Sequence, residues 1–119
     1  MTMTDDNASS FTSAHFIGIG GAGMSGIAHV LHERGCRVTG SDLKASSYVR
    51  DLVDAGVEVH IGHRASTIDE TVPDLVVTSS AVPEDNPEVV RARELNIPVW
   101  PRAKMLWALS RGSLTIAVA

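Results

Sequence analysis

The chain has 119 residues, of which 44% are hydrophobic and 20% charged, which is ordinary for one globular domain with a buried core. The formal net charge of −4 argues against nucleic acid or an anionic membrane as the main partner. No apolar run approaches the ~20 residues of a membrane span, and the polar first 13 residues lack a signal-peptide core. Because Cys36 is the single cysteine, no internal disulfide can form, and we expect a cytoplasmic protein.

Strands and helices are predicted to alternate after a polar arm, residues 1–13, that we expect to be flexible. Short apolar stretches predict strands at residues 15–19, 36–40, 57–61, 74–78 and 97–100. Apolar residues at helical spacing predict helices around residues 24–31, 49–56, 87–95 and 102–110. Asn86 and Pro87 have the residue types of a cap and first turn, and Pro98 favours an edge strand. In the last helix, Ala103, Leu106 and Trp107 are predicted to share the buried face.

This alternation predicts an α/β, Rossmann-like domain of three layers over residues 14–112, with a mostly parallel sheet of about five strands. Ligands of such sheets bind beyond the carboxyl ends of the strands. The loops to consider are therefore residues 18–26, 40–46, 61–66 and 79–86. Residues 113–119 contain another apolar run, which either completes the sheet or is the first strand of a further domain of a longer protein. We favour the second interpretation.

The loop after the first predicted strand holds the pattern Gly-x-Gly-x-x-Gly, extended by one more glycine. It leaves a strand and enters an amphipathic helix, which is the context that the dinucleotide fingerprint requires. Its glycines permit a tight turn, a close approach of the backbone to a diphosphate, and close packing of helix on strand. The N–H groups of residues 22–25 and the helix dipole would bind the anion; the alternative is a tight turn without a ligand. The candidate residues are Gly18, Gly20, Gly21, Ala22, Gly23, Met24, Ser25 and Gly26.

Polar side chains follow the other predicted strands. Asp42 either accepts a hydrogen bond from a ribose hydroxyl or caps a turn. Ser79 and Ser80 either donate to a phosphate or sugar or cap their own loop. His63 and Arg64 offer a ring for stacking and a cation for phosphate, or form a solvated loop pair.

No catalytic constellation is recognisable in the sequence. It contains no Walker-type phosphate loop and no nucleophile–base pair. The remaining histidines lack metal-ligand spacing and are interpreted as structural: His15, His29, His32 and His60. We therefore assign no catalytic, cofactor-binding or metal-binding residue, and expect this chain to bind a nucleotide without catalysing a reaction.

The stretch HFIGIGGAGMSGIA at residues 15–28 closely resembles the N-terminal domain of the Mur ligases of bacterial peptidoglycan synthesis. Further matches are TGSD at 39–42, GHR at 62–64, VTSSAV at 77–82, NPE at 86–88, IPV at 97–99 and RAKML at 102–106. The resemblance covers residues 14–119. It adds Ser41 and strengthens Asp42, His63, Ser79 and Ser80 as candidate residues for binding a UDP group.

The resemblance also implies a reaction. In this family the N-terminal domain binds the UDP part of UDP-N-acetylmuramic acid, a central domain binds ATP and Mg²⁺, and a C-terminal domain completes the amino-acid site. ATP phosphorylates the substrate carboxylate, and the amine of L-alanine attacks the acyl phosphate. Residues 113–119 would then begin the central domain, and the other domains of the same protein would be this domain's partners. The rival interpretation is an NAD(P)-binding domain of a dehydrogenase or regulatory module, whereas a bare interaction domain leaves the glycine loop unexplained.

Overall fold

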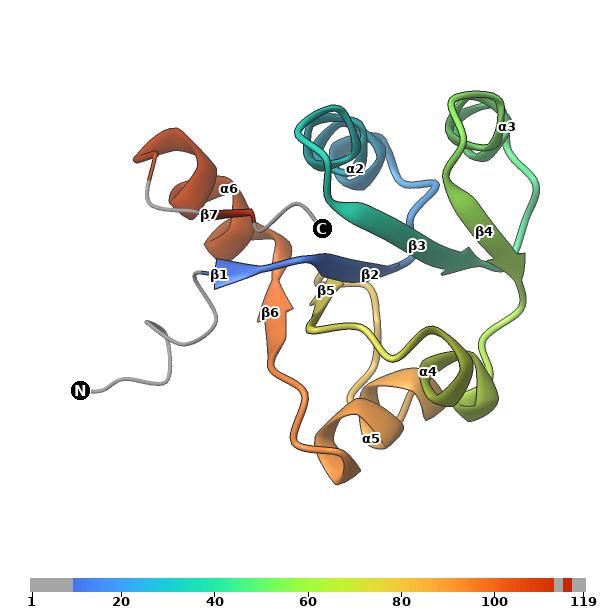
Figure 1. The fold of residues 1–119 in the computed structure, drawn as a ribbon. Coiled ribbons are helices and arrows are strands. Elements are labelled where there is room, and N and C mark those ends of the chain that lie inside the picture. The colour runs from blue at the N-terminus through green and yellow to red at the C-terminus, as the bar shows by residue number, and fades with distance from the viewer. Residues whose placement is uncertain (1–9, 113–114, 117–119) are drawn as a thin grey trace.

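Five parallel strands form the central sheet of the computed structural model, which describes residues 10–112 and 115–116 (Figure 1). The strands run in the spatial order β4-β3-β2-β5-β6, and every neighbouring pair is parallel. Because the chain moves outward from β2 in one direction and then returns to β5 on its other side, the order reverses between these two strands. The Rossmann-like prediction is confirmed. The bounds are β2 Ser13–Ile17, β3 Arg37–Asp42, β4 Glu58–Ile61, β5 Leu75–Thr78 and β6 Val99–Pro101.

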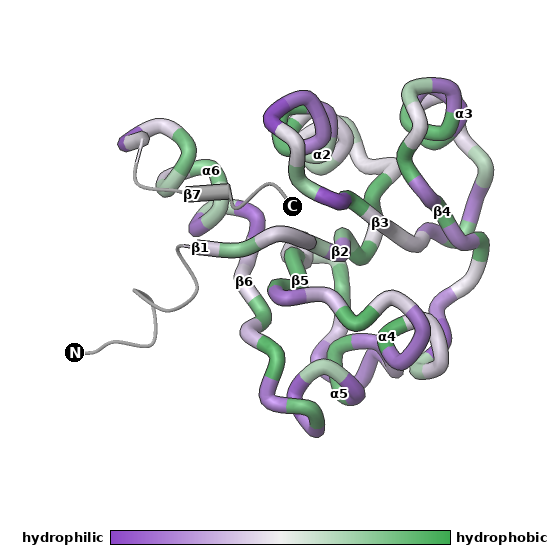
Figure 2. The backbone as a smooth tube through the Cα atoms, viewed as in Figure 1, coloured by the Kyte–Doolittle hydropathy of each residue, from purple (hydrophilic) through white to green (hydrophobic). Residues whose placement is uncertain are grey.

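Helices cover both faces of this sheet. On one face lie α2 (Ala22–Glu33), α3 (Ser47–Asp54) and α6 (Arg102–Ser110), and on the other lie α4 (Ala65–Thr71) and α5 (Pro87–Glu94). Figure 2 shows hydrophobic and hydrophilic residues mixed along these helices, as expected where one side of a helix packs on a sheet. Asn86 caps α5 as predicted, since its side chain accepts a 2.9 Å hydrogen bond from the N–H of Glu88.

Two hydrophobic cores result, because successive residues of a strand point to opposite faces. Phe16 packs with Met24 and Leu31 in the larger core, beneath α2, α3 and α6. Ile17, the next residue, packs with Ile68 in the smaller core, beneath α4 and α5. All five side chains are at least 98% buried.

Two helices differ from the sequence prediction. We predicted no helix at α4, whose buried side is formed by Thr67, Ile68 and Thr71 and therefore carries little hydrophobic periodicity. In α6 the predicted buried face is wrong, because Met105 and Ala108 are buried whereas Trp107 is 58% exposed. Within the described ranges, no helix is long and apolar enough to span a bilayer.

A second, two-stranded parallel pairing joins β1 (Ser10–Phe11) to β7 (Thr115–Ile116). We expected a flexible arm through residue 13, but residues 10, 11 and 13 lie in strands and Phe11 is 3% exposed. The carboxylate of Asp74 fixes this segment by accepting hydrogen bonds from the N–H and hydroxyl of Thr12, at 2.9 and 2.8 Å. Residues 1–9 and the remainder of the expected strand at 113–119 lie outside the described residues.

We predict that Gly40→Ala lowers the free energy of unfolding by about 1–3 kcal/mol, the usual cost of overpacking. A Cβ at residue 40, in β3, would stand 2.7 Å from the Cβ of Ile19, which is itself fully buried. Gly26→Ala is the matched control, because a Cβ at that exposed position of α2 would meet no atom within 4 Å. Urea unfolding of both variants measures the difference, and equal stabilities would contradict this packing.

Candidate diphosphate-binding site

The glycine loop between β2 and α2 is fixed to the end of β3. The N–H groups of Gly18 and Ile19 donate to the carbonyl oxygen of Ser41, at 2.8 and 3.1 Å. The N–H of Gly20 donates to the carboxylate of Asp42 at 2.7 Å. Gly18 has φ of +80°, a conformation that favours glycine and turns the chain from strand into loop. The path of the loop is therefore set by its neighbour in the sheet.

Two N–H groups at the start of α2 are left for a ligand. The N–H groups of Met24 and Ser25, which we expected to face an anion, instead donate to the carbonyl oxygen of Gly21 at 3.0 and 2.8 Å. Their side chains are buried as well. The N–H groups of Ala22 and Gly23 have no acceptor within the described part of the chain. Since the first turn carries no acidic residue, the positive end of this helix has no negative group of its own.

Arg102, which sequence reasoning missed as a site residue, lies over this helix end. A Cβ added to Gly23 would stand 3.2 Å from Nη1 of Arg102, so the guanidinium group is adjacent to the first turn of α2. Arg102 forms no ion pair with any described residue. A cation beside the positive end of a helix is repelled by it unless an anion lies between them. The arrangement therefore favours an anionic ligand.

A cavity of about 460 Å³ opens between the carboxyl ends of β5 and β6 and the start of α6. Ser79 is half-buried there, and its hydroxyl caps its own loop by accepting from the N–H of Ala81 at 3.3 Å. Ser80 is exposed. Both predicted serines therefore line the same cavity as Arg102. Its lining is Thr78, Ser79, Ser80, Val82, Pro83, Glu84, Pro101, Arg102 and Ala103.

Asp42 has the turn-capping role that was one of its two predicted alternatives. One carboxylate oxygen accepts from the N–H groups of Leu43 and Lys44, at 2.7 and 3.3 Å, and the other holds Gly20. A Cβ at Gly20 would stand 2.8 Å from this carboxylate and from Cγ2 of Val49. Gly20 therefore serves close packing beneath the loop. Gly26 lies further along α2, in a groove between α2 and α6 that Ala22, Gly23 and Arg102 also line.

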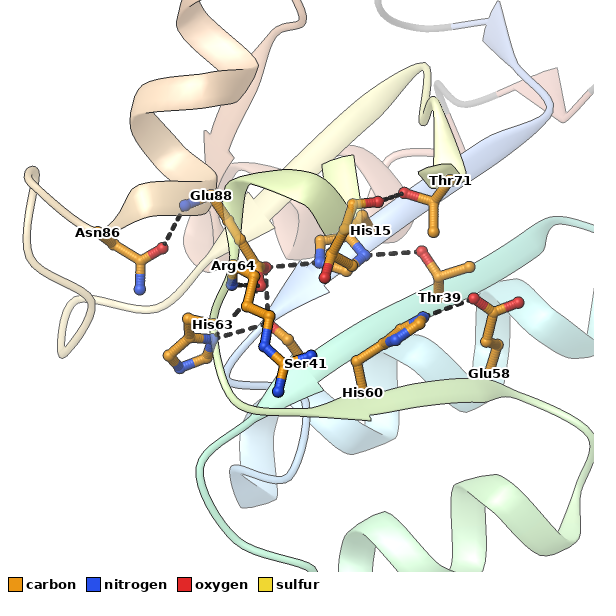
Figure 3. A network of polar contacts seen from close by, with 11 residues as sticks. His15, Thr39, Ser41, Glu58, His60, His63, Arg64, Thr71, Asn86 and Glu88 are labelled. Atoms are coloured by element: carbon orange, nitrogen blue, oxygen red, sulfur yellow. Dashed lines mark hydrogen bonds and ion pairs between the residues drawn. The ribbon is translucent and has the colours of Figure 1, made fainter. Parts of the chain in front are cut away.

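Ser41 does not face the ligand side as we expected. It is fully buried, because it precedes Asp42 on β3 and so points to the opposite face of the sheet, toward α5. Its hydroxyl donates to the carboxylate of Glu88 at 2.7 Å and lies 2.8 Å from Nδ1 of His63. His15 contacts the same carboxylate at 2.7 Å, so these residues form one buried polar network (Figure 3).

Glu88 is the charged centre of that network, and its side chain has no exposed surface. Burial raises the pKa of Glu88, but the hydrogen bond and electrostatic attraction of His15, with hydrogen bonds from Ser41 and Arg64, outweigh burial and hold the pKa below its ordinary value. An ionised carboxylate only accepts hydrogen bonds, so the groups that contact Glu88 are its donors.

A scan of protein families matches residues 13–113 to the description "Mur ligase family, catalytic domain". The chain belongs to the Mur ligase family. A UDP-N-acetylmuramate–L-alanine ligase of Legionella pneumophila (strain Corby) is 57% identical over 105 residues, which are 88% of this chain and 22% of that relative. The chain therefore spans about a fifth of the length of the curated relatives it matches.

Solved Mur ligase structures share the fold. The UDP-N-acetylmuramate–alanine ligase MurC from Thermotoga maritima is 36% identical with a TM-score of 0.77, covering 83% of this chain and 23% of that one. The UDP-N-acetylmuramate:L-alanyl-gamma-D-glutamyl-meso-diaminopimelate ligase from Neisseria meningitides is 28% identical with a TM-score of 0.74, covering 84% and 31%. This Mur ligase domain thus combines the family's fold with the helix end and arginine described above.

For the site we predict that Gly23→Ala weakens UDP binding without destabilising the fold. The new Cβ would displace only the exposed side chain of Arg102, whereas alanine raises helix propensity by about 1 kcal/mol over glycine. Urea unfolding and UDP titration, run together, measure both effects. A variant that bound UDP as tightly as the parent chain would show that the diphosphate binds elsewhere.

Proposed function

We propose that this chain is the substrate-binding domain of a UDP-N-acetylmuramate–L-alanine ligase and holds the UDP group of UDP-N-acetylmuramic acid. The observation that carries the proposal is that the N–H groups of Ala22 and Gly23 have no acceptor among the described residues and lie beside the guanidinium group of Arg102. The named relatives supply the choice of nucleotide, and the helix end supplies the reason why a diphosphate binds.

In this proposal the diphosphate accepts hydrogen bonds from Ala22 and Gly23 and a charge-assisted hydrogen bond from Arg102. Its negative charge lies between two positive groups and removes their repulsion. The cavity near Ser79 and Ser80, at about 460 Å³, is within the usual size of small-molecule sites and suits the sugar that follows the diphosphate. The uridine then extends the other way, over the ends of β3 and β4.

ATP and Mg²⁺ would be bound by other domains of the longer protein, which also bind L-alanine. The described residues contain no group of three side chains able to hold a metal ion. The glycine loop continues from Gly26 into Ile27 and Ala28, without the lysine and hydroxyl residue that follow the last glycine of a Walker loop. These residues do not fit ATP and Mg²⁺. In this proposal the domain holds the substrate, and another domain of the same protein activates the reacting carboxylate. The whole enzyme would act in the cytoplasm.

NAD(P) binding remains the competing proposal, because a glycine loop followed by an acidic residue also suits a dinucleotide. The two proposals differ in the ligand that the purified 119-residue chain accepts. We predict that UDP and UDP-N-acetylmuramic acid raise its melting temperature, since a ligand that binds only the native state stabilises it, and that NAD and NADP do not.

Arg102→Ala should weaken UDP binding by about 10- to 100-fold, the range expected for a hydrogen bond to a charged group. Arg111→Ala is the matched control: it removes a cation from just beyond the other end of α6, where Arg111 stacks on Trp107. Calorimetric titration compares the two variants. Stabilisation by NAD and by no uridine nucleotide would reverse the proposal, and equal affinities of the two variants would refute the role of Arg102.

A further inference from the structure

The buried carboxylate of Glu88 forms a hydrogen bond with the backbone of the loop that follows β4. One oxygen accepts from Nε2 of His15 and from the hydroxyl of Ser41, both at 2.7 Å. The other accepts from the backbone N–H of Arg64 at 2.9 Å. Figure 3 shows these donors converging on Glu88 from β2, β3 and the loop. A single charge in the first turn of α5 therefore contacts two strand side chains and one loop backbone group.

The hydrogens of this network determine the tautomer of His63. Ser41 has one hydroxyl hydrogen, and it is donated to Glu88. Its oxygen can then only accept from Nδ1 of His63, 2.8 Å away, so Nδ1 carries a hydrogen. In a neutral imidazole the other nitrogen, Nε2, is then an acceptor. Nε2 has no hydrogen-bond partner in the described part of the chain.

His63 also lies at the edge where the proposed nucleotide binds. The N–H of Gly62 donates to the carbonyl oxygen of Asp42 at 2.7 Å, and the carboxylate of Asp42 holds Gly20 at the same distance. The loop of His63 is therefore joined through Asp42 to the glycine loop. Since β4 is two strands from β2, the loop of His63 lies roughly 10 Å along the sheet edge from the glycine loop.

We propose that Glu88 is a positioning residue which, through Ser41, holds His63 with Nε2 as an acceptor for a hydrogen-bond donor of the uridine. This proposal rests on the proposed function. Three groups of uridine can donate a hydrogen bond to Nε2: the N3–H of uracil and the 2′- and 3′-hydroxyls of the ribose. Without the relay the ring is free to take either tautomer, and a ring with hydrogen on Nε2 repels the same donor.

The test compares Ser41→Ala with Thr39→Val in UDP titrations. Ser41→Ala breaks the relay between Glu88 and His63. Thr39→Val is the matched control, because it removes a buried hydroxyl from the same strand and the same network, 2.7 Å from Nδ1 of His15, without touching His63. We expect Ser41→Ala to bind UDP several-fold more weakly, in proportion to the fraction of rings that lose the hydrogen on Nδ1, and Thr39→Val to bind UDP like the parent.

Two further experiments distinguish a positioning role of Glu88 from a general loss of structure. UDP methylated at N3, 2′-deoxy-UDP and 3′-deoxy-UDP each lack one donor. The analogue without the recognised donor should bind the parent and Ser41→Ala equally. Proton–nitrogen NMR of the imidazole in mildly alkaline buffer should show His63 with hydrogen on Nδ1 in the parent and in Thr39→Val, and a mixture in Ser41→Ala.

Three results would overturn the relay: hydrogen on Nε2 of His63 in the parent chain, equal UDP affinity of the two variants, or the same loss in Ser41→Ala for UDP and all three analogues. These results leave UDP binding by the parent chain intact, so they refute the relay alone. A parent chain that binds no UDP refutes the proposed function together with the relay.

Discussion

The end of β3 fixes the glycine loop, and the site depends on that attachment. The carbonyl oxygen of Ser41 and the carboxylate of Asp42 take the N–H groups at the start of the loop, and the helix cap takes those of Met24 and Ser25. The N–H groups of Ala22 and Gly23 have no acceptor among residues 10–112 and 115–116. Both residues are exposed, so a bound anion would replace water as the acceptor of these N–H groups and would be attracted by the positive end of the helix.

The two faces of the sheet carry charged groups of opposite sign near its edge. On the side of α2 and α6, an arginine and a helix end create a local positive site in a chain whose formal net charge is −4. On the side of α4 and α5, Glu88 is buried and kept ionised by its donors. Adjacent residues of β3 reach both sides, because Asp42 points to the glycine loop and Ser41 to Glu88. Strand alternation thus connects the anion site to the loop of His63.

Local pattern predicted most of the fold. The five strands of the central sheet and four of the helices follow from apolar periodicity and caps. Two elements lacked that signal: α4, with its threonine-rich buried side, and β1, which lies in the segment that we expected to be flexible. The site was less predictable because it depends on non-local contacts. Ser41 and Asp42 differ by one residue, so their opposite roles require the register of β3. Arg102 matters only because α6 packs beside α2, although its place directly after an edge strand was a usable signal.

The most direct test of the account is a titration of the isotopically labelled chain with UDP, followed residue by residue through backbone amide chemical shifts. If the diphosphate binds at the start of α2, the amide signals of Ala22 and Gly23 should show the largest changes, because these N–H groups gain an anionic acceptor. The amides of Met24 and Ser25, already paired with Gly21, should move less. Saturable shifts elsewhere that leave Ala22 and Gly23 unchanged would contradict the account.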